Sequence, residues 1–351
     1  MRSARSRHVV LEPFVITVEN LTKSFPGAAK PVHALRDVSV EVPAGALFGV
    51  VGPAGSGKST LTRCIALQEK PDRGVVRLDG LNTTGLDGRR LREVRRQVAV
   101  LDAQPVLHAE RTVAGNVAAP LEQLGLDGPQ RRSRVGRLLD LAGLTQRAAL
   151  RPSELTPGQR RRVALARSLA AGPAVLLADD PTAGVGVEET GAVLTVLDRA
   201  RAELGVTVLL TTQDGAAVRR VCDGVAVLED GRLVEQGTVL ELLANPASKV
   251  AQSLLPPIDT PRSQSAGYDR SVDVVLIGFA AVGALLPEAS ARFDVDLATI
   301  GGGLTRVGDT PVARFRVGVN GSQADAALAW IADRGAHVVH PKEGPKSIVA
   351  A

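Results

Sequence analysis

The octapeptide "GPAGSGKS", residues 52–59, constrains this chain more than any other feature, because it is a complete match to the pattern G-x-x-x-x-G-K-S/T. An apolar run that predicts a buried strand, "ALFGVV" (46–51), precedes it, and a stretch that predicts a helix, "STLTRCIALQ" (59–68), follows it. A glycine-rich turn between a strand and a helix directs backbone N–H groups and the helix N-terminus at one point, where they attract phosphate. The sequence therefore predicts an α/β fold with a site for a nucleoside triphosphate at this turn.

The residues of this phosphate loop have separate expected roles. We expect the Lys58 ammonium to reach the β- and γ-phosphates and the Ser59 hydroxyl to bind Mg²⁺. The residues expected to contact the nucleotide here are Gly52, Pro53, Ala54, Gly55, Ser56, Gly57, Lys58, Ser59 and Thr60.

Buried strands and helices alternate along the chain after the phosphate loop. The segments "AVLLAD" (174–179) and "VTVLLTT" (206–212) predict buried strands, with a helix at 187–204 between them. This alternation is typical of a mostly parallel α/β sheet. Alternating segments over 14–46 predict additional antiparallel strands, and 224–237 predicts a hairpin that turns at Asp230-Gly231. Further helices are expected over about 127–150 and after residue 156.

The length of 351 residues allows two domains. We expect a basic extension at 1–13, a nucleotide-binding domain at 14–250, a linker rich in Pro and Ser at 251–270 and a second domain at 271–345. The second domain shows the order strand, helix, strand, strand, helix, strand, which predicts a small ferredoxin-like α+β fold.

Composition excludes several functions and locations. The net charge of +5 comes with interspersed acidic residues and only 2% aromatics, so the arginine runs at 89–96 and 131–137 indicate solvated helix faces and not nucleic-acid binding. The two cysteines, Cys64 and Cys222, lack metal-like spacing and are expected to be buried thiols. No apolar run approaches the ~20 residues that cross a bilayer, and we expect a cytoplasmic protein.

A second motif, "LTPGQRRRVALARSLA" (155–170), lies between the phosphate loop and Asp179, the last residue of an apolar strand. Together these features resemble the ATP-binding subunits of ABC transporters, over about residues 14–246. The segment 291–340 resembles the small C-terminal regulatory domain found in subunits of the methionine-importer type.

The resemblance implies a P-loop ATPase fold and a head-to-tail homodimer, in which each ATP lies between one chain's phosphate loop and the other chain's signature motif. Here the signature residues would be Thr156, Gly158 and Gln159, and Asp179 would bind Mg²⁺. Phe25 would stack on adenine, although a core Phe at a strand end explains it as well. The family's water-polarising and switch positions are Asp180 and Gln213, so the catalytic residues would be Lys58, Asp180 and Gln213.

The resemblance also implies partners. Two membrane permease subunits would contact the surface flanked by Arg111 to Glu122, at the cytoplasmic face of the membrane, and an extracytoplasmic binding protein would deliver the substrate. An amino-acid effector, methionine in this family, would bind the C-terminal domain. Ala298 stands in a segment where the family often has asparagine, which predicts weak or altered sensing.

The chain departs from the family pattern at five places. Asp180 replaces a glutamate, Gln213 replaces a histidine, and Pro157 follows Thr156 where the family has serine and glycine. The loop glutamine is Gln104, one place late, because Ala103 occupies the aligned position. The family's SALD segment is "AGVG" (183–186) and lacks the aspartate.

Two interpretations follow from these departures. Compensating substitutions would preserve a slow but real ATPase, whereas accumulated losses would leave a subunit that binds ATP and hydrolyses it poorly; we favour impaired turnover. A regulatory protein that closes on ATP without driving transport is the alternative function.

Overall fold

The computed structural model describes residues 14–27, 30–245, 248–258 and 267–339. Residue contacts divide the chain into two compact units, Met1–Gln236 and Gly237–Ala351, and each unit has its own apolar core. The expected extension at 1–13 and residues 259–266 of the expected linker lie outside the described residues.

A six-stranded sheet of order β10-β9-β3-β8-β7-β6 forms the centre of the first unit. β3 pairs in parallel with β8 and β9, and β8, β7 and β6 continue the parallel arrangement. The carboxyl ends of β3, β8, β7 and β6 therefore lie at one edge of the sheet. The strands are β3 (Leu47–Val51), β6 (Val98–Leu101), β7 (Val175–Asp179), β8 (Thr207–Thr212), β9 (Gly224–Glu229) and β10 (Arg232–Thr238).

A second, antiparallel sheet of order β2-β1-β4-β5 shares an apolar core with the first. Side chains from both sheets, such as Val40, Val50 and Leu209, are buried in this core. Its strands are β1 (Phe14–Phe25), β2 (Val32–Pro43), β4 (Arg73–Leu78) and β5 (Leu81–Asn82).

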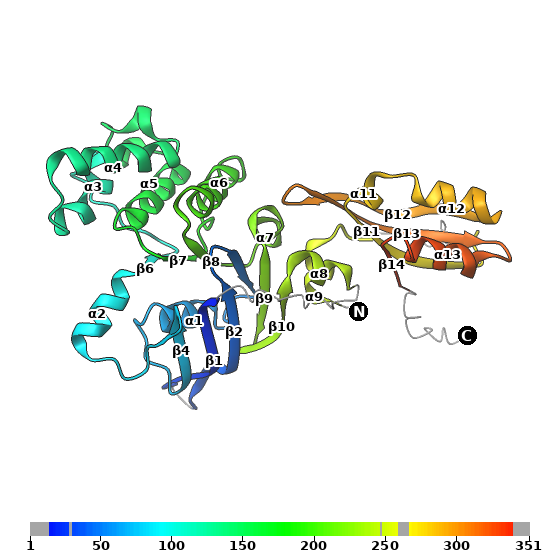
Figure 1. Ribbon diagram of the computed structural model, residues 1–351, viewed down its shortest axis with the longest axis horizontal. Helices are drawn as coiled ribbons and strands as arrows, with labels where there is room; N and C mark the ends of the chain where they lie inside the picture. The colour runs from blue at the N-terminus through cyan, green and yellow to red at the C-terminus, as the bar shows by residue number, and fades with distance from the viewer. Residues whose placement is uncertain (1–13, 28–29, 246–247, 259–266, 340–351) are drawn as a thin grey trace, which may run out of the picture. The chain divides into compact units, whose positions relative to one another are not determined.

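Five helices of the first unit begin where a polar side chain accepts a hydrogen bond from a free N–H group of the first turn. Asp87, Thr112, Asp127, Thr156 and Asp214 accept such hydrogen bonds at the starts of α2, α3, α4, α5 and α7. α3 to α6 form a helical group, shown in green in Figure 1. The helices are α1 (Lys58–Ile65), α2 (Gly88–Arg96), α3 (Val113–Gln123), α4 (Gly128–Leu141), α5 (Pro157–Leu169), α6 (Val187–Leu204) and α7 (Gly215–Val221), with 3₁₀ turns at Thr145–Arg147 and Pro152–Glu154.

The second unit holds an antiparallel sheet of order β12-β13-β11-β14. In chain order this is strand arrangement 2-3-1-4, that of a ferredoxin-like fold, and α12 and α13 share its apolar core. The elements are α8 (Val239–Ala244), α9 (Lys249–Leu254), β11 (Arg270–Ile277), α11 (Phe279–Val282), α12 (Leu285–Phe293), β12 (Asp296–Val307), β13 (Thr310–Asn320), α13 (Ala324–Ala332) and β14 (Ala336–Val339).

The structure confirms the predicted fold class, a parallel α/β sheet with antiparallel and helical parts plus a small α+β unit. The predicted helix at 187–204 coincides with α6, and the predicted hairpin turns at Asp230 and Gly231, both of which have positive φ. α8 and α9 fall in the second unit, although residues 14–250 were expected to form one domain. Both helices are short, so their own sequences carry little information about which core they join.

Both cysteines are free and buried, as expected. Burial raises the pKa of the Cys64 thiol to about 12, so this thiol is unreactive at neutral pH.

Candidate functional site

The phosphate loop turns from β3 into α1 through glycines at positions that disfavour a larger residue. Gly55 and Gly57 have φ values of 76° and 105°, in the left-handed region that favours glycine. A Cβ at Gly57 would lie 2.3 Å from the Ala34 carbonyl oxygen, and a Cβ at Gly52 would lie 2.0 Å from that of Leu228. Surrounding backbone therefore holds the loop in a shape that needs glycine at these positions.

Lys58 is buried at the start of α1, and its ammonium bonds the loop itself. Nζ donates to the carbonyl oxygens of Gly52 at 2.7 Å and Pro53 at 2.8 Å. Burial lowers the pKa of this lysine, and the charges of Asp180 and Asp179 oppose that shift. The ammonium is thus held within the phosphate loop and in the electric field of both carboxylates.

Asp179 and Asp180 follow one another at the carboxyl end of β7. The Thr211 hydroxyl on β8 donates to Asp179 Oδ1 at 2.5 Å, which orients that carboxylate. Asp180 has a φ of 44°, and its N–H donates to the Thr211 carbonyl at 2.9 Å. The Thr212 hydroxyl lies 3.5 Å from Asp180 Oδ1.

The two carboxylates are close enough to affect one another. Burial raises the pKa of Asp180, and the charge of Asp179 raises it further. Lys58 and Arg161 act in the opposite direction. Asp180 therefore holds a proton more readily than an ordinary aspartate does, and it is a candidate general base.

The two predicted glutamines follow strands of the same sheet. Gln213 comes directly after β8, and Gln104 lies in the loop after β6; both side chains are exposed. Because the strands are parallel neighbours, the sheet edge that carries the phosphate loop also carries Asp179, Asp180, Gln213 and Gln104.

Two oxygen ligands suitable for Mg²⁺ are present at this edge. Ser59 is exposed in the first turn of α1, and Asp179 is only partly buried. Mg²⁺ prefers oxygen ligands and keeps several waters, so one hydroxyl and one carboxylate fit it together with phosphate oxygens. Within the described ranges, no three His, Cys, Asp or Glu side chains form a dedicated metal cluster.

The signature residues begin α5, in the helical group. The Thr156 hydroxyl accepts from the Gln159 N–H at 3.2 Å, the Gln159 side chain accepts from the Thr156 N–H at 3.2 Å, and Pro157 is the first helical residue. Among the described residues no hydrogen bond joins the signature to the phosphate loop of the same chain. The carboxylate of Glu189, on α6, accepts from both the Thr156 hydroxyl and the Gly158 N–H.

Arg161 is a site residue that sequence reasoning missed. It is 6% exposed and donates to the carbonyl oxygens of Asp102 at 3.1 Å and Ala183 at 2.7 Å. It thus joins the loop after β6 to the loop after Asp180. The sequence does carry a signal for Arg161. This cation shares one face of α5 with Gly158, Ala164 and Leu165, which are otherwise small or apolar.

Phe25 ends β1 and is half-buried. The Lys23 ammonium lies 5.1 Å from the centre of its ring, within cation–π range. Stacking on adenine stays a prediction for this residue.

The surface flanked by Arg111 and Glu122 consists of α3 and the loop that precedes it. The fully buried Asn116 amide donates to the carbonyls of His108, Arg111 and Thr112 and so holds the preceding loop on α3. Arg111 pairs with Glu122 at 2.7 Å, and this hydrogen bond lowers the pKa of Glu122.

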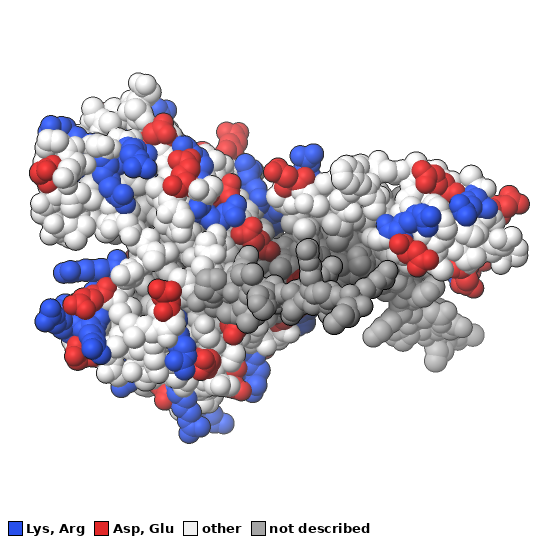
Figure 2. Space-filling model, in the orientation of Figure 1, with Lys and Arg blue, Asp and Glu red and all other residues white. Residues whose placement is uncertain are grey.

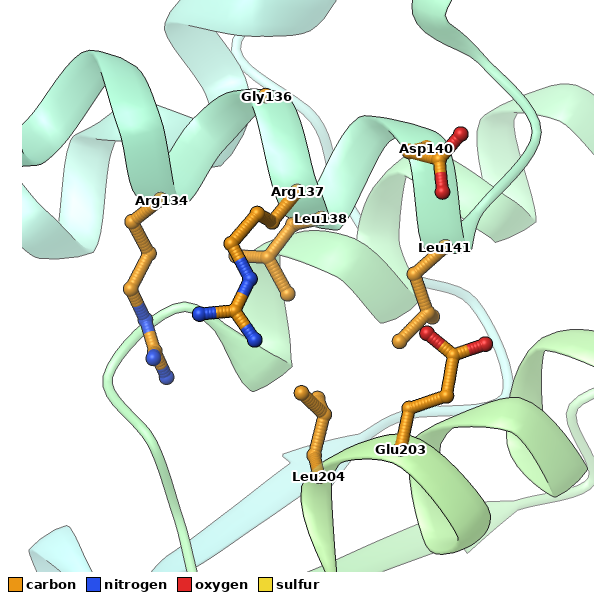
Figure 3. A pocket seen from close by; sticks show the side chains of 8 residues that line it. All are labelled: Arg134, Gly136, Arg137, Leu138, Asp140, Leu141, Glu203 and Leu204. Atoms are coloured by element: carbon orange, nitrogen blue, oxygen red, sulfur yellow. The ribbon is translucent and has the colours of Figure 1, made fainter.

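A pocket elsewhere in the first unit lies between α4 and α6 (Figure 3). None of the phosphate-loop residues lines it. Its lining residues are Arg134, Gly136, Arg137, Leu138, Asp140, Leu141, Glu203 and Leu204.

Positive and negative side chains are mixed on the surface: on the face shown in Figure 2, Lys and Arg lie among Asp and Glu. On α2, Arg89 pairs with Glu93 at 3.4 Å.

In the second unit, β11 and β13 bring a partly buried ion pair to one face of the sheet. Arg316 holds both carboxylate oxygens of Asp273, at 2.8 and 3.1 Å, and this hydrogen bonding raises the pKa of Arg316. Ala298 on β12 lies opposite Gly318 on β13.

Comparison with known families and proteins agrees with this geometry. Residues 35–183 match the family model of the ABC transporter, and residues 270–339 match the NIL domain. The chain is 40% identical over 320 residues to the methionine import ATP-binding protein MetN of Thermobifida fusca, covering 91% of this chain and 98% of that protein. It is 41% identical over 324 residues to MetN of Myxococcus xanthus, with coverage of 92% and 97%.

Two solved structures resemble about two thirds of the chain. The dimeric structure of MJ0796, a bacterial ABC transporter cassette, is 31% identical with a TM-score of 0.58, covering 64% of this chain and 98% of that one. CbiO1 from Clostridium perfringens, part of the ABC transporter complex cbiONQ, is 27% identical with a TM-score of 0.61, covering 67% and 92%.

The fold defines a P-loop nucleotide-binding protein of the ABC type, with an additional NIL domain. The chain belongs to the ABC transporter family of ATP-binding proteins and, within it, to the group whose members are named methionine import ATP-binding protein. No helix in the described ranges is long and apolar enough to span a membrane.

Proposed function

We propose that this protein is the ATP-binding subunit of an ABC importer for methionine or a related amino acid. The observation that carries the proposal is the gathering of Lys58, Asp179 and Asp180 at one sheet edge, in a chain that matches methionine import ATP-binding proteins over nearly their full length. The phosphate loop would bind ATP, and Ser59 and Asp179 would bind its Mg²⁺, which supplies charge neutralisation at the phosphates.

The working form in this proposal is a homodimer. One solved relative is described as a dimeric structure in a post-hydrolysis state bound to ADP and Pi. The signature residues Thr156, Gly158 and Gln159 of one subunit would face the phosphate loop of the other, because they begin a helix N-terminus that favours anions. Closure of the dimer on ATP would then transmit force to the transporter.

The partners in this proposal are two membrane permease subunits and an extracytoplasmic binding protein, with the chain attached at the cytoplasmic face of the membrane. The Arg111–Glu122 surface is the proposed contact, because Asn116 holds its loop in a fixed shape. We further propose that the NIL domain binds the transported amino acid as an effector.

We infer that ATP turnover is slow. Asp180 would act as the base that polarises the attacking water, with Gln213 as a hydrogen-bonding partner of the γ-phosphate. The aspartate side chain is one methylene shorter than the glutamate it replaces, and a misplacement of ~1 Å lowers a rate by up to ~10²-fold. Gln213 donates and accepts hydrogen bonds but does not carry a proton as histidine does.

A transport assay tests this proposal. The full chain and its permease would be reconstituted in vesicles containing Mg-ATP, the binding protein would be added outside the vesicles, and uptake of labelled methionine would be measured. We expect ATP-dependent uptake that Lys58→Ala abolishes. ATP binding without uptake, under conditions where the permease copurifies, would favour the regulatory alternative.

A further inference from the structure

The N-terminus of α5, which carries the signature motif, already holds a carboxylate of its own chain. Glu189 lies in the first turn of α6. One of its carboxylate oxygens accepts from the Thr156 hydroxyl and the other from the Gly158 N–H, the latter at 3.2 Å.

This contact uses the donors that an incoming phosphate would need. Pro157 has no N–H, and the Gln159 N–H is bonded to Thr156 Oγ1. The Gly158 N–H is therefore the backbone donor that the start of the helix offers to an anion, the Thr156 hydroxyl lies beside it, and Glu189 accepts from both. Charge-assisted hydrogen bonds of this kind are stronger than neutral ones.

The Glu189 side chain also packs closely against the start of α5. A Cβ added at Gly158 would lie 2.7 Å from Cβ and 2.8 Å from Cδ of Glu189. The Glu189 side chain thus lies directly against the Gly158 backbone. The partial positive charge at the N-terminus of the 13-residue α5 adds a favourable interaction with an anion at this position.

We propose that Glu189 is an internal competitor of the ATP γ-phosphate at the signature motif. This inference rests on the proposed function, in which the partner subunit presents its ATP to this helix. Two anions do not share the same donors, so closure of the ATP-bound dimer requires the Glu189 side chain to rotate away.

ATP-dependent dimerisation of the full chain tests the proposal. Glu189→Thr removes the carboxylate and leaves Thr156 and Gly158 intact. Glu188→Thr is the matched control, because Glu188 is exposed in the same turn of α6 and loses the same charge. Glu189→Gln is a second variant that retains the size of the side chain.

Sedimentation velocity would be measured with Mg²⁺ and a non-hydrolysable ATP analogue, and nucleotide binding by a fluorescent ATP derivative. We expect Glu189→Thr to lower the dimer dissociation constant about tenfold or more, since it releases two charge-assisted hydrogen bonds. Glu189→Gln should show a smaller gain, and Glu188→Thr should match the wild type.

The outcomes separate this inference from the proposed function. If all variants bind nucleotide but Glu189→Thr dimerises no better than Glu188→Thr, the competitor role of Glu189 is wrong and the proposed function stands. If the folded wild type does not bind nucleotide, the proposed function fails and this inference fails with it.

Discussion

The Arg161 guanidinium donates to the Ala183 carbonyl oxygen at 2.7 Å, and so a buried cation on the signature helix holds the loop that follows Asp180. A second bond, to the Asp102 carbonyl at 3.1 Å, holds the loop that leads to Gln104. Two loops of the candidate ATP site therefore depend on one side chain.

Arg161→Gln should destabilise the first unit and lower ATP turnover. The shorter side chain would leave at least one of these two carbonyls without its charged donor, at a loss of about 1–3 kcal/mol. Urea unfolding and steady-state hydrolysis would measure the two effects. Arg92→Gln, at an exposed position on α2, is the control and should leave both unchanged. Equal stability of the two variants would contradict the role assigned to Arg161.

Lys58→Ala should weaken ATP binding sharply, by about tenfold or more, because it removes a buried ammonium from the phosphate loop. Fluorescent-nucleotide titration measures the affinity. Arg63→Ala removes an exposed cation from the same helix and should retain wild-type affinity. An unchanged affinity in Lys58→Ala would show that Lys58 does not contact the phosphates.

Asp180→Asn should raise the thermal stability of the Mg²⁺-free protein at neutral pH. Burial and Asp179 raise the folded-state pKa of Asp180 above its unfolded value of about 3.9, so its ionisation favours the unfolded chain. Below both pKa values the Asp180 carboxyl is protonated in the folded and in the unfolded chain, so it no longer lowers the stability. The destabilisation therefore develops as pH rises from about 4 through the raised folded-state pKa.

Thermal unfolding between pH 7 and pH 4 would follow this effect. The difference in Tm between Asp180→Asn and wild type should be largest at pH 7 and should narrow as the pH falls. Asp102→Asn, at an exposed position in the same unit, is the control. A difference that grows toward acid would contradict the raised pKa.

Ala298→Asn should strengthen methionine binding by the full chain. Ala298 lies on β12 opposite Gly318, and an amide there adds one donor and one acceptor for a zwitterionic ligand. Isothermal calorimetry with methionine on both proteins measures the gain. Heats at the level of buffer for both would remove the effector role of this domain.

The sequence predicts those parts of the molecule that depend on local pattern. The phosphate loop needs glycines at 55 and 57 because φ is positive there, and this need is visible in the motif. Asp179 ends an apolar run, and the helix at 187–204 has regular apolar spacing. These features follow from neighbouring residues alone.

Arg161 and Glu189 act through tertiary contacts, and local pattern does not reveal them. Arg161 bonds a carbonyl 59 positions away, and Glu189 bonds an N–H 31 positions away. Only the packing of α5 against α6 brings the second pair together.

Steady-state Mg-ATP hydrolysis by the purified full chain tests the central claim most directly: an ATP site that turns over slowly because Asp180 and Gln213 replace better-placed groups. Wild type should hydrolyse ATP well below ~1 s⁻¹, under the usual enzyme range, and Lys58→Ala should abolish this activity. Asp180→Glu should raise the rate, and adding Gln213→His to that variant should raise it further. The gain of the double variant should exceed the sum of the gains of the two single variants, because both groups act on one transition state. A wild-type rate of ~1–10 s⁻¹ that Asp180→Glu does not increase would contradict the claim and identify an ordinary transport ATPase that uses an aspartate.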